Sequence, residues 1–220
     1  HVLSADGGLL WWAPPLVLAL YGLLQLALAE GPQRAEARVH LGLLLVYGLV
    51  VASLSFEGGW RVGPRYLVVA LPSLVLGWAH VLAQLRTHAL GLAVFVALAS
   101  YAVAINALAA NLWPHLDLTN VHQPVAEVLL PLWEHGRQPY GLLRALTGHS
   151  ELGLVVVGSV LGLWVLVASA AESGIRMVVA IASGAVAGLL LVQATRGLEP
   201  HPRGARNLAY IERIWEPTDQ

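Results

Sequence analysis

The stretch Ala89–Leu112 reads ALGLAVFVALASYAVAINALAANL and contains no Asp, Glu, Lys or Arg. A transmembrane α-helix needs about 20 consecutive, mostly apolar residues to cross a hydrocarbon core of roughly 30 Å. This stretch meets both requirements. Because no water inside a bilayer can satisfy the backbone, we expect the stretch to form a helix that spans a membrane.

Further apolar segments of comparable length lie on both sides of this stretch, at residues 9–29, 41–56, 66–85, 152–171 and 177–195. The chain as a whole is 57% hydrophobic and only 11% charged, whereas soluble domains carry about 25% charged residues. The sequence therefore predicts an all-α, polytopic transmembrane helix bundle with about six spans.

The alternation of apolar and polar segments also predicts how the chain is divided. Residues 1–112 are expected to form a four-helix transmembrane portion that includes the loop GGWRVGPR. Residues 113–151 form a long extracytoplasmic segment, in which 125–133 is expected to be a short interfacial helix. Residues 152–195 form a transmembrane helix pair, and residues 196–220 form a polar tail.

Small residues recur at a spacing of four in the last two spans, at Gly158 and Gly162 and again at Ala180, Gly184 and Gly188. Such spacing lets helices approach closely. We expect these residues to support packing within the chain, with dimerisation as the alternative.

Arginine placement favours one orientation. The connections on one side of the expected bundle are short and carry Arg34, Arg38, Arg86 and Arg176. Positive residues in short loops favour the cytoplasmic side. The 57–65 loop, the 113–151 segment and the tail are therefore predicted to lie outside the cytoplasm.

The composition of the chain argues against some kinds of function. The net charge is −1, which indicates no nucleic-acid role, and the chain has no Cys, which excludes thiolate chemistry.

The basic residues are all Arg, as in a GC-rich bacterial genome, so we expect a multi-pass protein of the bacterial inner membrane. Residue 1 is His and no basic signal-peptide region follows, so the chain is expected to begin within a longer polypeptide.

The expected spans contain almost no ionisable side chains, and His80 is the clearest exception. Proton-coupled carriers place carboxylates at membrane depth, so the sequence disfavours an ion- or proton-coupled carrier. We expect His80 to be a hydrogen-bonded or snorkelling residue at the interface.

The loop 57–65, EGGWRVGPR, carries the most informative chemistry. Its glycines permit close backbone approach, and its proline presets the entry into the next helix. Arg61 and Arg65 can each present a bidentate guanidinium fork to a phosphate near headgroup depth, at a helix N-terminus. A lipid-linked phosphate is a suitable ligand. The alternative is a tight turn whose arginines contact bulk lipid headgroups.

Histidines of the long segment raise the question of a metal site. They are His115, His122, His135 and His149, with Asp117 close to the first. Zinc sites need three or four converging ligands, and neither HxxxH nor HExxH occurs. We therefore expect solvated loop histidines and assign no metal or other cofactor. A divalent metal ion is compatible with the chemistry, but nothing in the sequence supports one.

Several segments resemble bacterial polytopic glycosyltransferases of the GT-C type, a group similar to the dolichyl-phosphate-mannose mannosyltransferases and the lipid A aminoarabinose transferases. The resemblance spans roughly residues 40–165 and rests on GGWRVGPRYL at 58–67, Leu-Pro at 71–72, WPH at 113–115, NVHQP at 120–124 and PLWEHG at 131–136. It includes no catalytic signature.

The resemblance implies a sugar transfer from a polyprenyl-phosphate carrier to an extracytoplasmic acceptor. The catalytic carboxylate of such enzymes lies nearer the N-terminus of the full protein, so the catalytic residues of this chain stay unknown. Arg61 and Arg65 would bind the lipid phosphate, Glu57 and Trp60 would shape the loop, and Tyr66 would anchor the helix start. The implied partners are membrane lipids, the polyprenyl-phosphate sugar, and the rest of the polypeptide or a partner subunit.

Two other interpretations stay open. A non-catalytic membrane subunit, or a lipid-binding scaffold of a larger complex, explains the apolar helices and small-residue faces equally well. Half of a transporter or flippase is disfavoured because no intramembrane charge marks a path. Sequence upstream of residue 1 distinguishes these interpretations, since an acidic pair in an external loop favours the enzyme.

Overall fold

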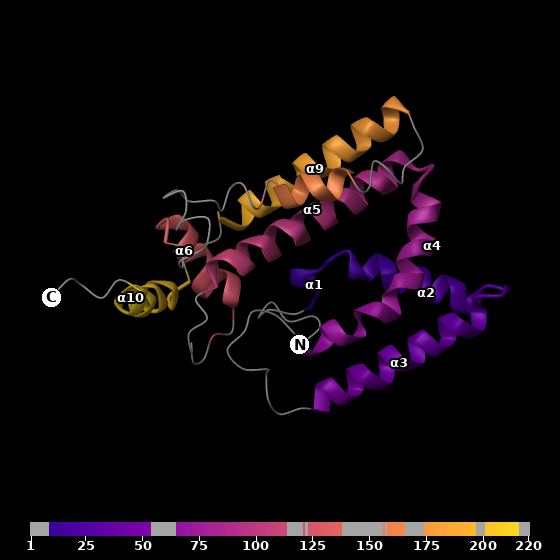
Figure 1. Cartoon of the computed structure of the whole chain (residues 1–220), viewed down its shortest axis with the longest axis horizontal. Helices are drawn as coiled ribbons and strands as arrows, with labels where there is room; N and C mark the ends of the chain where they lie inside the picture. Colours follow the sequence, from indigo (N-terminus) through magenta and orange to yellow (C-terminus); the bar gives the residue numbers. More distant parts are fainter. Residues whose placement is uncertain are drawn as a thin grey trace.

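A computed structural model describes residues 9–53, 65–113, 121, 123–137, 156, 158–165, 174–196 and 201–215. All regular structure in these residues is helical, which confirms the predicted all-α class (Figure 1). The helices are α1 (Leu9–Trp12), α2 (Leu16–Leu28), α3 (Arg34–Ser53), η1 (Arg65–Leu74), α4 (Val75–Leu85), α5 (Ala89–Leu112), η2 (Val125–Leu129), α6 (Leu130–Glu134), α9 (Ile175–Arg196) and α10 (Gly204–Trp215).

Three of these helices, α3, α5 and α9, are long and apolar enough to cross a membrane. They have 20, 24 and 22 residues, and a helix rises about 1.5 Å per residue, so each reaches the roughly 30 Å of a hydrocarbon core. They correspond to the predicted spans 41–56, 89–112 and 177–195. By length and composition they indicate a multi-pass membrane protein.

Most of the surface of α3 is apolar and exposed, as expected for a helix surrounded by lipid. Ala37 is the buried residue of this helix. Its large apolar side chains are exposed over most of its length, at Val39, Leu43, Leu45, Val46, Leu49 and Val50. A water-soluble monomer rarely exposes so long an apolar surface, whereas a helix in lipid does so at no cost.

The other predicted spans are less regular. The span 9–29 is divided into α1 and α2 around Pro14 and Pro15, which have no backbone N–H to donate. The span 66–85 begins as the 3₁₀ helix η1, contains Pro72, and continues as α4. Long 3₁₀ segments are uncommon, and here the winding changes from 3₁₀ to α between Leu74 and Val75, shortly after Pro72. Of the span 152–171 the structure describes residues 156 and 158–165, which are helical.

Helices α2 and α4 pack through glycine. A Cβ atom built on Gly22 would overlap the carbonyl of Gly77, and one built on Gly77 would overlap the carbonyl of Ala19. Farther along, Gln84 of α4 reaches Gln25 of α2. Contacts advance in the same direction along both helices, so α2 and α4 are parallel neighbours.

Helices α5 and α9 form a second parallel pair of the same kind. A Cβ atom on Gly184 would meet the carbonyl of Ala93, and one on Gly188 would meet the carbonyl of Ala97. Ala180, one helical turn earlier, is buried. The prediction that this small-residue set supports packing within the chain is confirmed. Gly158 and Gly162 have no such neighbour among the residues that the structure describes.

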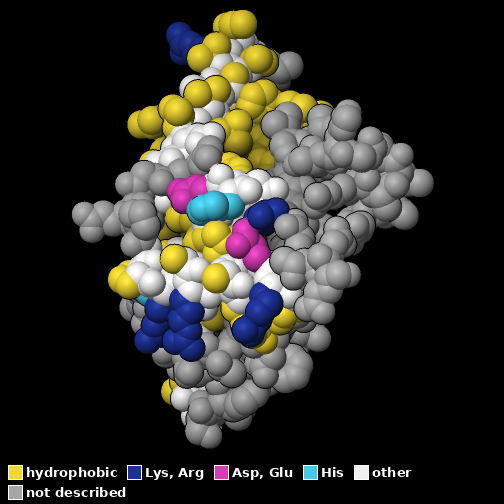
Figure 2. Space-filling view, turned by 90° about the vertical axis from the view of Figure 1, so that its left-hand side faces the viewer, with side chains coloured by type: hydrophobic (Ala, Val, Ile, Leu, Met, Phe, Trp, Pro, Cys, Tyr) yellow, Lys and Arg dark blue, Asp and Glu magenta, His cyan; other side chains and the backbone are white. Residues whose placement is uncertain are grey.

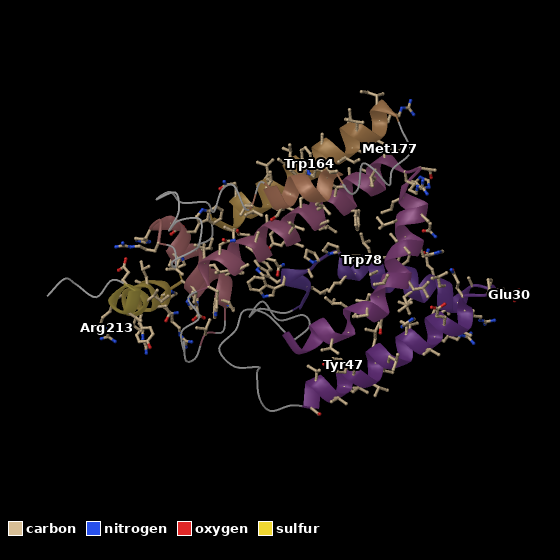
Figure 3. The ribbon with its side chains drawn as sticks, viewed as in Figure 1. Glu30, Tyr47, Trp78, Trp164, Met177 and Arg213 are labelled. Atoms are coloured by element: carbon tan, nitrogen blue, oxygen red, sulfur yellow. The ribbon has the colours of Figure 1, made fainter. Side chains whose placement is uncertain are left out.

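Trp78 joins the two helix pairs (Figure 3). Its indole Nε1 lies 3.3 Å from the carbonyl oxygen of Pro15, to which it donates. Its ring meets Phe95 of α5 edge-on, with ring centroids 6.5 Å apart. Asn106 of α5 links that helix to α1, because its Nδ2 donates to the carbonyl oxygen of Trp12 at 2.8 Å.

The two ends of the bundle differ. Glu30, in the turn between α2 and α3, and Arg213 of α10 lie at opposite ends of the molecule (Figure 3). Helices α3, α5 and α9 all run away from the end at which α2 is joined to α3 and α4 to α5 (Figure 1). Their C-terminal ends, and the start of η1, lie toward the end that carries η2, α6 and α10.

Exchanging Gly77 for Ala should test the α2–α4 contact. The added methyl group meets backbone atoms that cannot rotate away, so the thermal midpoint in detergent should fall, by the equivalent of about 1–3 kcal/mol. Gly48→Ala on α3 is the matched control, because a Cβ at Gly48 has open space among the described residues. That variant should be neutral or slightly stabilised. Equal midpoints for the two variants would contradict the packing.

Candidate functional site

The predicted phosphate loop is only partly within the described residues. Glu57, Trp60 and Arg61 lie outside them. Arg65 and Tyr66 are the first residues of η1, and for these two the backbone is described. Helix η1 packs against α3 and α2, and its start lies toward the end where α3 finishes (Figure 1). Phosphate binding by these five residues stays a prediction.

At the same end of the molecule, η2, α6 and α10 pack together into a cap, the name used below for these three helices. The short helix expected at 125–133 is confirmed by η2 and α6. The tail 196–220 was predicted only as polar, but it contains α10. Because η2 and α6 follow α5 while α10 follows α9, the cap brings the long segment and the tail together on one side.

Apolar contacts hold α10 in the cap. Leu208 is 7% exposed and Ile211 is fully buried, and Gly204 lies against the ring of Pro131. The sequence signal for this helix is the spacing of residues 204, 208 and 211, which recurs at helical intervals within a charged segment. This helix was not predicted, because the tail as a whole is polar.

Two polar contacts fix which face of α10 is turned toward the rest of the cap. Arg137 Nε donates to Glu212 Oε1 at 2.8 Å, and Asn207 Nδ2 donates to the carbonyl oxygen of Glu127 at 3.2 Å. The Arg137 and Glu212 side chains are 38% and 34% exposed. Water screens a pair of this kind, so its contribution is at most about 1 kcal/mol. The buried apolar residues therefore dominate the stability of the cap.

Glu127 is the buried acidic residue of the described part of the chain, with 1% of its surface exposed. Its Oε1 accepts a hydrogen bond from the backbone N–H of Gln123 at 3.0 Å. In return, the Glu127 N–H donates to the Gln123 carbonyl oxygen at 2.8 Å. This reciprocal contact closes the start of η2 and helps to offset the desolvation of the carboxylate. Sequence analysis did not single out Glu127, although its spacing from Gln123 ahead of an apolar run is a usable signal.

The outer face of α10 is basic (Figure 2). Arg206 and Arg213 are exposed, and the Arg213 guanidinium carbon lies 5.7 Å from the centroid of the Tyr210 ring. This face lies opposite the buried residues Leu208 and Ile211. The cap is therefore apolar inside and carries positive charge on the surface that faces away from its core.

The histidines do not assemble into a metal site within the described residues. His135 Nδ1 lies 2.9 Å from the carbonyl oxygen of Pro131, one turn earlier in α6. His115, His122 and His149 lie outside the described residues.

A chain of polar side chains joins α2 to α4 near the opposite end of the bundle. Gln25 Nε2 donates to the Tyr21 hydroxyl at 2.8 Å, and Gln84 Nε2 donates to Gln25 Oε1 at 3.4 Å. The same Gln84 nitrogen lies 2.9 Å from His80 Nε2. The predicted hydrogen-bonded role of His80 is thus confirmed.

No protein-family model matches the chain, and no curated protein or solved structure is similar to it. The resemblance of the 58–67 segment, and of the later segments up to residue 136, to GT-C glycosyltransferases therefore stays a prediction from their motifs.

Exchanging Ile211 for Asp should detach α10 from the cap. The change places an unpaired carboxylate in an apolar contact and should cost more than about 3 kcal/mol locally. Trypsin cleavage after Arg206, followed by mass spectrometry of detergent-solubilised protein, should accelerate at least tenfold. Ile214→Asp, at a site that is 43% exposed, is the matched control and should leave cleavage unchanged. Equal rates for the two variants would show that α10 is not held by Ile211.

Proposed function

We propose that the chain is the membrane-embedded part of a glycosyltransferase that moves a sugar from a polyprenyl-phosphate carrier to an extracytoplasmic acceptor, and that this part binds the lipid phosphate. The observation that carries the proposal is the placement of Arg65. It begins η1 beside α3, whose large apolar side chains are exposed and would face lipid in a membrane. A lipid phosphate beside α3 would thus lie close to a helix start that carries an arginine.

The topology in this proposal has six crossings in the bacterial inner membrane. Parallel packing of α2 with α4 and of α5 with α9 supports it, because each pair needs one return crossing between its members. Helix α3 supplies the first return, and the segment that includes 158–165 supplies the second. The end with Arg34, Arg38, Arg86 and Arg176 is then cytoplasmic by the positive-inside rule, and the cap is external.

In this mechanism Arg61 and Arg65 stabilise the negative charge that develops on the departing lipid phosphate. Glu57 and Trp60 shape the loop, and Tyr66 holds the helix start. A carboxylate that activates the acceptor hydroxyl is also required. The catalytic residue stays unassigned in this proposal, which leaves the role to a further part of the polypeptide or to a partner subunit.

Cysteine labelling should establish the orientation, because the natural chain contains no Cys. Ala205→Cys in the cap should react with a membrane-impermeant maleimide in intact spheroplasts. Thr87→Cys, in the turn between α4 and α5, should react only after permeabilisation. Both positions are exposed in the structure. The reverse pattern would invert the orientation, and labelling of both from one side would rule out this topology.

Exchanging Arg65 for Ala in the full-length protein should abolish most sugar transfer. Loss of a charge-assisted contact to phosphate costs about 1.5–3 kcal/mol, which corresponds to a 10- to 150-fold weaker interaction. Binding of polyprenyl phosphate should weaken to the same degree, and Arg65→Lys should restore part of it. Arg86→Ala, at the opposite end of the bundle, is the control and should retain both activities. Unchanged transfer and binding in Arg65→Ala would remove the assignment.

The second candidate is a non-catalytic membrane subunit or lipid-binding scaffold of a larger complex. The observation in its favour is the length of the exposed apolar surface of α3, which can contact either lipid or the helices of another subunit. Purification in a mild detergent distinguishes the two candidates. Sugar transfer by the isolated full-length polypeptide supports the enzyme, whereas a requirement for a second protein supports the subunit.

A further inference from the structure

We draw no further inference here: the strongest candidate, the exposed apolar face of α3 around Leu45 and Leu49, can be covered by lipid as readily as by another helix, and nothing in the structure shows what covers it.

Discussion

Close contact between helix backbones at glycine is the interaction on which this structure depends. In lipid, apolar side chains gain nothing by leaving the solvent for each other, so helix association relies on packing and on hydrogen bonds between helices. Gly77 against Ala19 and Gly184 against Ala93 bring helix surfaces together without an intervening side chain. Trp78 then links the two pairs through Pro15 and Phe95.

Both glycine-packed helix pairs are parallel, and this arrangement constrains how the connecting segments run and where the following helices lie. Parallel neighbours cannot be joined by a short turn, so the chain must return between them, through α3 in the first pair. The same constraint makes α5 and α9 finish at one end. Segments that follow them, η2 with α6 and then α10, meet there and form the cap. The start of η1 lies toward this end as well, so the proposed phosphate site is at the same end of the bundle as the cap.

Much of the fold could be predicted from the sequence, because the membrane imposes a length and polarity on each segment that local composition reveals. The helices α3, α5 and α9 and the short helix at 125–133 were all predicted in this way. The candidate site was predicted less completely. Arg65 was singled out from its loop and its role stays a prediction, whereas Glu127 and Arg137 were missed because their contacts come from helix α10, which is distant in the sequence.

The sequence by itself determined that the chain is helical and has segments long and apolar enough to cross a membrane, since runs of uncharged residues as long as a bilayer is thick are typical of transmembrane helices. Only the tertiary structure decided which small residues are used for close packing between helices. Gly184 and Gly158 have equally suggestive spacing, but only Gly184 has a backbone carbonyl close by among the described residues. Spacing along one helix says which residues share a face, while the neighbour of that face depends on how the other helices are arranged.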